Sequence, residues 1–389
     1  MSRIKVLIVD DSAAARQALS VLLASDPGIQ VLPPAQDAFD AAAKMRDGLP
    51  DVMLLDLELP RMNGLAFLRK IMAQHPLPVI VCSSHSEKGS SAALKAMEIG
   101  AAGVIGKPRL GTPREREEAQ VVLSDAVRGA VQMGRTRHGG AGPAAPRAAT
   151  GNAPLTAAAM GATAARRPAA APMSPGPKLT ADAVLPPPRK GAIAPANMSP
   201  LVAIGASTGG TEALTSILPK LQPTCQPIVI VLHMPEKFTG AFAQRLDSLS
   251  QIEVREAVNG DRPEPGLALL APGSHHMVVN RAGTGYRVTI VDGPQVSRHR
   301  PSVDVLFRST AIAAGHAAFG ILLTGMGDDG ARGLVEMRDC GAETLVQDEA
   351  SSIVWGMPGE AFRMGAASRQ VSLDRMPAEI HRFCAQVGV

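Results

Sequence analysis

Four short apolar runs in the first 110 residues each lead into a polar residue, and this arrangement constrains the fold more than any other feature. The runs span residues 4–9, 52–55, 79–82 and 104–105, with segments of helix length between them. Apolar runs spaced in this way are typical of buried parallel strands in a βαβ sheet. In such sheets the functional crevice lies outside the carboxyl ends of the strands. The polar residues that follow the runs are therefore expected to lie together.

The polar residues at these strand ends are of the types that phosphoryl transfer requires. They are three carboxylates, a hydroxyl and an ammonium: Asp10, Asp11, Asp56, Ser83 and Lys107. Three carboxylates that lie close repel one another, and a hard divalent cation such as Mg²⁺ relieves the repulsion by binding oxygen ligands. Any one of these residues alone could simply end a strand at a turn. All five in register predict a phosphorylation switch that uses Mg²⁺.

This set of residues resembles the receiver domain of two-component response regulators. The resemblance implies that Asp56 accepts a phosphoryl group from a histidine kinase. It implies that Asp10 and Asp11 hold Mg²⁺ together with Asp56. Ser83 is the implied switch hydroxyl, and Lys107 is the ammonium that pairs with the phosphate.

The resemblance covers residues 1–135 and extends to local structure. The Lys107–Pro108 peptide bond is expected to be cis, as it usually is in this family, and a cis bond is plausible only before proline. Asn63 stands where the family more often has Asp. That position is a predicted turn, where Asn and Asp serve equally well.

The last helix of this domain has a clear N-terminal signal, and a change in composition follows its end. Thr112 is the predicted N-cap, Pro113 takes the first helical position and Glu115 completes a capping box. Residues 136–198 then consist largely of Ala, Pro, Gly, Arg and Thr, with hardly any aromatic side chain. Such a composition buries too little apolar surface to offset its ordering entropy, so a disordered linker is expected.

The net excess of positive charge comes largely from one segment, which includes most of this linker. The net charge is +4, and residues 126–181 contain no Asp or Glu. A basic arm for nucleic acid is one interpretation, but without aromatic residues for stacking it offers only nonspecific electrostatics. A solubilising tether with an r.m.s. span of roughly 45 Å is favoured. No nucleic-acid partner is expected.

The remaining composition indicates a cytoplasmic protein without membrane insertion. No apolar stretch approaches transmembrane length, and the first apolar run is too short for a signal peptide and stops at two aspartates. The four cysteines lie far apart with no CxxC pair, so neither a zinc site nor a disulfide framework is predicted.

Three later apolar runs, at residues 201–204, 228–232 and 320–323, are predicted core strands of a second sheet. The first run leads into a glycine-rich turn at 205–210 and then into a helix. Glycine permits close backbone approach or positive φ, and a helix N-terminus presents free N–H groups. This turn suits either a phosphate or an oxyanion.

A serine, a histidine and two aspartates follow these strands, namely Ser207, His233, Asp328 and Asp329. Serine, histidine and one aspartate can form a triad, which is recognised by geometry and role. The letters G-x-S-x-G also match the nucleophile elbow of α/β-hydrolases, but those enzymes place the histidine last in the chain. Spacing alone does not choose between Asp328 and Asp329.

This second part of the chain resembles the catalytic domain of chemotaxis protein-glutamate methylesterases. The resemblance rests on seven stretches: Gly205–Gly210, His233–Pro235, Ala271–Gly273, His299–Asp304, Thr324–Gly330, Gln347–Asp348 and Gly356–Pro358. It implies that Ser207 is the nucleophile, His233 the general base and Asp329 the carboxylate that orients it. The backbone N–H groups of Thr208 and Met326 are the implied oxyanion hole.

The resulting expectation is an α/β protein with two doubly wound parallel-sheet domains. A flavodoxin-like receiver domain (1–135) and a Rossmann-like methylesterase domain (199–389) are joined by the disordered linker (136–198). The implied activity is phosphorylation-regulated hydrolysis of glutamate methyl esters on methyl-accepting chemotaxis receptors, with deamidation of receptor glutamines as a second activity. Ester hydrolysis is expected to need no cofactor, and the chain is expected to be a monomer whose receiver domain covers the active-site face.

Two other output domains are alternatives. A DNA-binding response regulator would end in a compact helix-turn-helix, whereas about 190 residues of alternating strands and helices follow the linker. A non-catalytic scaffold would not need the three triad residues. The roles of four residues stay open. Arg298, His299 and Arg300 could contact an acidic substrate or anchor a loop, and His276 could lie near the site or have a structural role.

Overall fold

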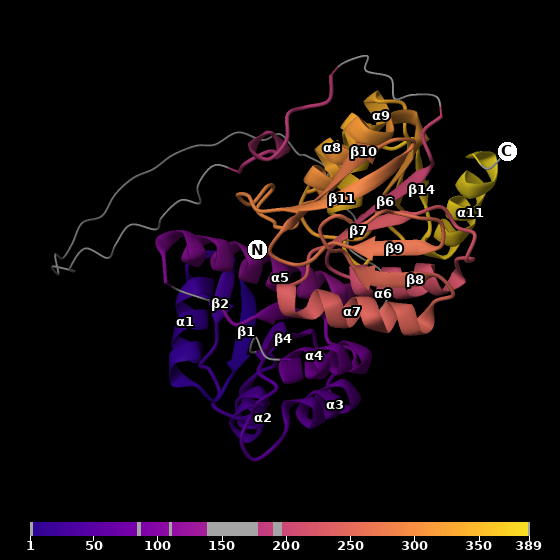
Figure 1. Ribbon diagram of the computed structural model, residues 1–389. Coiled ribbons are helices and arrows are strands. Elements are labelled where there is room, and N and C mark those ends of the chain that lie inside the picture. The colour runs from indigo at the N-terminus through magenta and orange to yellow at the C-terminus, as the bar shows by residue number, and fades with distance from the viewer. Residues whose placement is uncertain (1–2, 84–86, 109–110, 138–177, 190–196, 388–389) are drawn as a thin grey trace, which may run out of the picture.

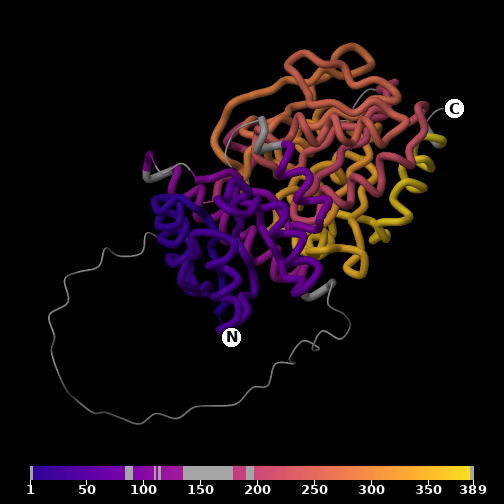
Figure 2. Tube along the Cα trace, turned by 90° about the horizontal axis from the view of Figure 1, so that it is seen from below, coloured from indigo at the N-terminus to yellow at the C-terminus, as the bar shows by residue number. Residues whose placement is uncertain are grey.

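The computed structural model describes residues 3–83, 87–108, 111–137, 178–189 and 197–387, which form two α/β domains (Figure 1). The N-terminal domain, in indigo and purple, packs against the C-terminal domain, in pink to yellow, and Figure 2 shows the same contact from below. Each domain is built on a parallel β-sheet. The predicted fold class is therefore confirmed.

The N-terminal sheet has five parallel strands in the order β2-β1-β3-β4-β5. They are β1 (Ile4–Val9), β2 (Ile29–Val31), β3 (Val52–Leu55), β4 (Val79–Ser83) and β5 (Gly103–Gly106). The four apolar runs are strands, as predicted, and only the short edge strand β2 lacked a clear sequence signal. The order reverses beside β1, so the carboxyl ends of β1 and β3 lie at the switch point of the sheet.

Helices cover both faces of this sheet. The helices are α1 (Ala13–Ala24), α2 (Ala38–Asp47), α3 (Gly64–Gln74), α4 (Glu87–Ile99) and α5 (Pro113–Arg137). Buried side chains of α1 and α5 pack on one face, and those of α2, α3 and α4 pack on the other. The capping box of α5 is confirmed, because the Thr112 N–H donates to a Glu115 carboxylate oxygen at 2.7 Å and the Glu115 N–H donates to Thr112 Oγ1 at 3.2 Å.

The C-terminal sheet has seven parallel strands in the order β14-β13-β12-β6-β7-β9-β8. They are β6 (Leu201–Ala206), β7 (Ile228–Leu232), β8 (Glu253–Glu256), β9 (Leu267–Leu270), β12 (Ala318–Leu322), β13 (Glu343–Gln347) and β14 (Arg369–Val371). A separate antiparallel hairpin joins β10 (His276–Ala282) to β11 (Gly285–Val291). The strand order reverses between β6 and β12, which places the functional crevice at their carboxyl ends.

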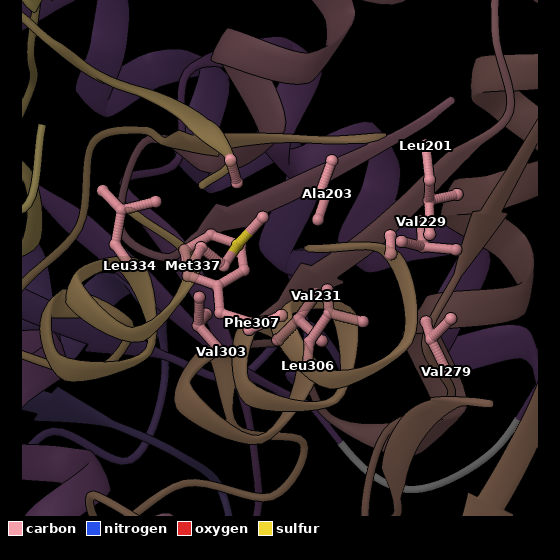
Figure 3. Close-up of a cluster of buried hydrophobic side chains, with 14 of the residues drawn as sticks. Leu201, Ala203, Val229, Val231, Val279, Val303, Leu306, Phe307, Leu334 and Met337 are labelled. Carbon is pink, nitrogen blue, oxygen red and sulfur yellow. The ribbon is translucent and has the colours of Figure 1, made fainter. Parts of the chain in front are cut away.

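The helices of this domain are α6 (Gly210–Ile217), α7 (Glu236–Leu249), α8 (Val303–Ala314), α9 (Ala331–Asp339), α10 (Met357–Arg363) and α11 (Met376–Val387). Helix α8 is central, because most of its residues are buried. Figure 3 shows Leu306 and Phe307 of α8 among Val231 of β7 and Met337 of α9. The start of α8 is therefore held by the core.

One local expectation is wrong, and the disorder predicted for residues 136–198 does not extend to all of them. The Lys107–Pro108 bond is not cis, since the cis peptide bond found in the described residues is Arg300–Pro301. A trans X–Pro bond is the lower-energy form unless the surroundings select cis. Of the predicted linker, residues 138–177 and 190–196 lie outside the described residues. Residues 178–189, however, pack against the C-terminal domain, with Ala181 buried in a short 3₁₀ turn.

Residues 178–189 are ordered because Val184 and Leu185 supply apolar surface and Asp182 pairs with Arg308. That partner lies 126 residues further along the chain, where a local composition argument does not reach. No helix in the described part of the chain is long and apolar enough to cross a bilayer.

Candidate functional site

The acidic residues predicted for the N-terminal domain converge at the carboxyl ends of β1 and β3. Carboxylate oxygens of Asp10, Asp11 and Asp56 lie within 4.8 Å of one another. The Lys107 ammonium lies 2.6 Å from Asp56 Oδ2 and 2.9 Å from Asp10 Oδ2. Ser83 is buried at the end of β4, and its backbone carbonyl accepts the backbone N–H of Lys107 at 3.1 Å. The structure therefore brings all five predicted residues to one site.

The charges of this cluster are mutually dependent. Burial raises the pKa of Asp10, although the hydrogen bond from Lys107 opposes that shift. Burial disfavours the Lys107 ammonium, but its hydrogen bonds to Asp56 and Asp10 outweigh this and raise the pKa of Lys107. Two buried carboxylates, Asp10 and Asp56, and an exposed one, Asp11, are the oxygen ligand set that suits a hard cation such as Mg²⁺.

In the C-terminal domain, Ser207 and His233 follow neighbouring strands in register. Ala206 of β6 pairs with Leu232 of β7. Ser207 follows directly after Ala206, and His233 follows directly after Leu232. The His233 N–H donates to the Ala206 carbonyl at 3.2 Å, and the Ser207 N–H donates to the Thr324 carbonyl at 3.0 Å. These backbone bonds bring the serine, the histidine and the loop after β12 to one end of the sheet.

Asp329 is the partner of His233. Its Oδ2 lies 2.8 Å from His233 Nε2, and both side chains are almost fully buried. Three further donors at the start of α8 surround the carboxylate: Ser302 Oγ at 2.8 Å, the Val303 N–H at 2.8 Å and the Asp304 N–H at 3.0 Å. Burial by itself would raise the pKa of Asp329, but the hydrogen bond from His233 and the charges around it hold that pKa at about 2.

Asp328, in contrast, points away from this arrangement. Its carboxylate is 46% exposed and forms an ion pair with Lys178. Of the two aspartates between which spacing left the choice open, Asp329 is the one that contacts the histidine.

A second carboxylate, that of Asp304 on α8, binds the N-terminus of α9. Asp304 Oδ1 accepts the N–H groups of Gly330 at 3.0 Å and Gly333 at 2.8 Å, and its Oδ2 accepts the Ser297 hydroxyl at 3.0 Å. Burial and the nearby Asp329 carboxylate raise the pKa of Asp304. The N-terminus of α9 is thus capped by Asp304 at the start of α8, and the N-terminus of α8 is capped by Asp329 just before α9.

The second ring nitrogen of His233 is the one available for chemistry. An ionised Asp329 accepts the Nε2–H, which leaves Nδ1 with its lone pair. Among the described residues this buried Nδ1 has no hydrogen-bond partner. The face of the ring is covered by His299, whose centroid lies 3.6 Å away at an interplanar angle of 11°. Burial and His233 lower the pKa of His299 to about 3, so this neighbour is uncharged at neutral pH.

The two predicted oxyanion donors lie in the turns beside Ser207. Within the described part of the chain, the backbone N–H groups of Thr208 and Met326 have no internal acceptor. Gly325 between the turns cannot be replaced easily, since a Cβ there would lie 2.8 Å from Ser207 Cβ and 2.3 Å from Met357 Sδ. The close approach of these two loops thus depends on glycine.

A cavity of about 410 Å³ lies over these residues, and both domains line it. Ser207, His233 and Met326 contribute from the C-terminal domain, while Val122 and Asp125 contribute from α5. Burial raises the pKa of Asp125, although nearby positive charges oppose the shift.

The domains also meet beside this cavity. Phe238 of α7 is buried in the hydrophobic cluster that fills one face of the N-terminal sheet. Arg245 of α7 pairs with Glu98 of α4, and the Thr208 side chain lies against Gly129 of α5. The N-terminal domain therefore covers the face that carries Ser207.

The residues whose roles the sequence left open divide into two groups. Arg298 and Arg300 line the cavity, and Arg300 Nη1 also donates to the Gly293 carbonyl at 2.7 Å. His276 is fully buried and lies behind the site, where its Nδ1 accepts the Ser302 N–H at 3.2 Å and its Nε2 lies 2.9 Å from the Pro294 carbonyl. Burial lowers the pKa of His276.

Sequence reasoning did not single out the Ser302 and Asp304 contacts or the stacking of His299. The only sequence signal was the His299–Asp304 stretch, which spans all three residues.

The geometry defines a phosphoacceptor-type α/β domain that covers an α/β domain with a Ser-His-Asp arrangement. A family model described as CheB methylesterase matches residues 202–380, and one described as response regulator receiver domain matches residues 6–113. The chain therefore belongs to the CheB methylesterase family, in the form that carries a receiver domain.

Several full-length relatives share about half of the residues. The protein-glutamate methylesterase/protein-glutamine glutaminase 5 of Anaeromyxobacter dehalogenans is 51% identical, with 98% of this chain and 97% of the relative covered. The relative of the same activity name numbered 2 in Rhodospirillum rubrum is 51% identical and covered to 98% on both sides. One encoded in the group 3 operon of Cereibacter sphaeroides is 50% identical, with 97% and 95% covered.

The environment of Asp329 generates a prediction about pH. Its folded-state pKa lies below the ordinary value of 3.8, so the carboxylate contributes stability above about pH 4 that is lost as the pH falls toward 2. Asp329→Asn should lower the free energy of unfolding at pH 7 by about 2 kcal/mol and flatten its decline between pH 4 and 2.

Trp355 is the only tryptophan of the chain and lies in the C-terminal domain, so its fluorescence during urea unfolding measures this effect. Asp328→Asn, at the exposed neighbour, is the matched control. Equal pH slopes for Asp329→Asn and the unmutated chain would contradict the assignment of Asp329 as the ionised partner.

Proposed function

We propose that the chain hydrolyses γ-methyl esters of glutamate side chains on methyl-accepting chemotaxis receptors, and that it deamidates receptor glutamines by the same acyl chemistry. The observation that carries the proposal is the convergence of Ser207, His233 and Asp329 at one end of the C-terminal sheet. The activity names of the full-length relatives support the same substrate class. A DNA-binding output is not favoured, because a seven-stranded parallel sheet follows the linker.

In the proposed reaction, Ser207 Oγ attacks the ester carbonyl while His233 Nδ1 removes its proton. Asp329 keeps His233 in the tautomer with Nδ1 unprotonated and stabilises the imidazolium that forms. The N–H groups of Thr208 and Met326 stabilise the oxyanion. Methanol leaves with the proton that His233 held. Water then attacks the acyl-enzyme with His233 as base again, which restores Ser207 and releases the glutamate carboxylate.

Deamidation follows the same course with ammonia as the leaving group. Neither reaction as proposed needs a cofactor. The product differs from the methyl ester by one negative charge, and added charge on a helical bundle increases repulsion between neighbouring helices. This is how the edit would alter receptor signalling.

The proposed control resides in the receiver domain. Asp56 would accept a phosphoryl group from a histidine kinase, and Mg²⁺ would be held by Asp10, Asp11 and Asp56. The ion would neutralise charge on the transferring phosphoryl group. Lys107 would pair with the phosphate once it forms, and the Ser83 hydroxyl would move toward it.

We assign residues 1–135 to the receiver unit and residues 199–389 to the catalytic unit, with the packed segment 178–189 added to the latter. In the unphosphorylated chain the receiver would block access to Ser207, and phosphorylation would weaken that contact. Interfaces of this kind are modest and polar, so a few kcal/mol suffice to shift the balance. We place the protein in the cytoplasm as a monomer without a nucleic-acid partner.

Replacing the proposed nucleophile should abolish turnover while the fold persists. Ser207→Ala should lower methanol release from methylated receptors by about 10⁴-fold or more, because the acyl-enzyme cannot form. Ser216→Ala on α6 is the control and should retain normal rates. Near-normal release by Ser207→Ala would show that another group performs the chemistry.

Phosphorylation should depend on Asp56 and Mg²⁺. A small phosphodonor such as phosphoramidate should add one phosphoryl group to the chain, and Asp56→Asn or chelation of Mg²⁺ should abolish labelling, because the acceptor or its counter-ion is then missing. Intact-mass measurement records the result, with Asp47→Asn on the exposed face of α2 as control. Undiminished labelling of Asp56→Asn would place the acceptor elsewhere.

The ion pair between Glu98 and Arg245 offers a test of inhibition by the receiver. Glu98→Arg should raise the basal esterase rate of the full chain severalfold, because two like charges then face each other across the domain contact. Adding Arg245→Glu should restore the low rate. Glu360→Arg, which disrupts an exposed pair within α10, should leave it unchanged. An unaltered rate in Glu98→Arg would argue that this contact does not restrain the enzyme.

A further inference from the structure

Residues 178–189, here called the strap, belong by sequence to the linker but lie on the C-terminal domain. Their main anchor is Arg308 of α8, whose side chain is only 6% exposed. Arg308 Nη1 donates to Asp182 Oδ1 at 2.6 Å and to the Leu185 carbonyl at 2.9 Å. The other side of the same guanidinium holds Glu336 of α9. A buried arginine with these partners fixes the middle of the strap.

Apolar packing extends this anchor toward the active-site loop. Val184 and Leu185 pack against a small cluster of Val278, Val296 and Val305, which come from three separate parts of the C-terminal domain. Because Val296 begins the loop that runs to Arg300, the strap covers the base of that loop.

The strap also holds the loop by a direct hydrogen bond, because the Leu179 carbonyl accepts the Ser297 N–H at 2.9 Å. The ion pair of Lys178 with Asp328 attaches the strap to a second loop, the one that follows β12. Ser297 and Arg298 have φ values of 50° and 68°, which is the left-handed region that non-glycine residues rarely occupy. Two such residues in succession persist only where the surroundings hold them.

This loop reaches the chemistry directly. His299 stacks on His233, and Arg298 lines the cavity. A shift of the loop would move the surface against which the His233 ring rests, and small displacements of a catalytic group are costly.

We propose that the strap positions the active site: by holding residues 296–300 it keeps His299 against His233 and fixes the orientation of that imidazole. Its residues touch neither substrate nor the reacting atoms, so they are positioning residues. The inference rests on the proposed function only where catalytic rates are measured. It gives a segment of the predicted linker a positioning role at the active site.

The test uses the full chain, phosphorylated with phosphoramidate and Mg²⁺. Lys178→Met combined with Asp182→Ala removes both charged contacts of the strap, whereas Lys178→Arg combined with Asp182→Glu preserves their charges. Asp339→Ala is the control, because Asp339 is as exposed as Asp182 (60% against 61%) and pairs with Arg338 of α9, not with a strap residue.

The first readout is the NMR signal of the His233 ring in chain labelled with ¹⁵N-histidine, assigned through His233→Gln. Loss of the stacked neighbour should shift this signal in the double variant, and the conservative pair should restore it. The second readout is kcat for methanol release, expected to fall about tenfold in the double variant and to return within twofold in the conservative pair. Asp339→Ala should change neither.

An unmoved His233 signal in the double variant would overturn the proposal, whatever the rates. A shifted signal with unchanged kcat would also overturn it, since the loop would then be held without effect on the reaction. A fall in thermal stability alone, with both readouts unchanged, would show a purely structural strap. If the unmutated chain released no methanol, the proposed function would fail, while a shifted His233 signal would still support the hold of the strap on the site.

Discussion

The candidate active site depends on one buried carboxylate at the start of a core helix. Asp329 accepts hydrogen bonds from His233 and from the first turn of α8, where unpaired N–H groups and the helix dipole favour negative charge. An ionised Asp329 sets the tautomer of His233, and that tautomer decides which nitrogen can accept a proton. Because α8 is packed on nearly all sides, the geometry of the site is determined by the hydrophobic core (Figure 3).

The reciprocal carboxylate adds a second constraint. Asp304 caps α9 while Asp329, just before α9, caps α8. Neither loop can move without breaking bonds at both helix ends. Two carboxyl groups lie close together in the interior as a result, and burial together with the nearby Asp329 carboxylate raises the pKa of Asp304. The starts of the two helices are therefore held by the same pair of side chains.

Residues that end strands were predictable because their positions follow from a local pattern. Apolar runs fixed where Asp56, Ser207 and His233 would lie, and parallel strands bring their carboxyl ends to one edge of the sheet. Contacts between segments that are distant in the chain produce no local pattern in the sequence. The pairing of Arg308 with Asp182 and the stacking of His299 on His233 depend on how loops pack, and the composition of residues 178–189 resembles the linker that precedes them. The trans Lys107–Pro108 bond was not predicted, because the expectation of a cis bond came from the family resemblance and not from a physical argument about this sequence.

The burial of Phe238 has a consequence for how easily the two domains part. This aromatic side chain belongs to the C-terminal domain but is part of a hydrophobic cluster of the N-terminal domain. Leu94 of the N-terminal domain packs in turn against a hydrophobic cluster of the C-terminal domain. A molecule whose domains part, as the proposed function requires, presents both side chains to water. Burying a Phe side chain fully contributes about 1.5–3 kcal/mol, so this contact by itself favours the packed arrangement of the two domains. Unlike the Glu98–Arg245 ion pair, the apolar contact is not weakened by salt, so high ionic strength alone should not separate the domains.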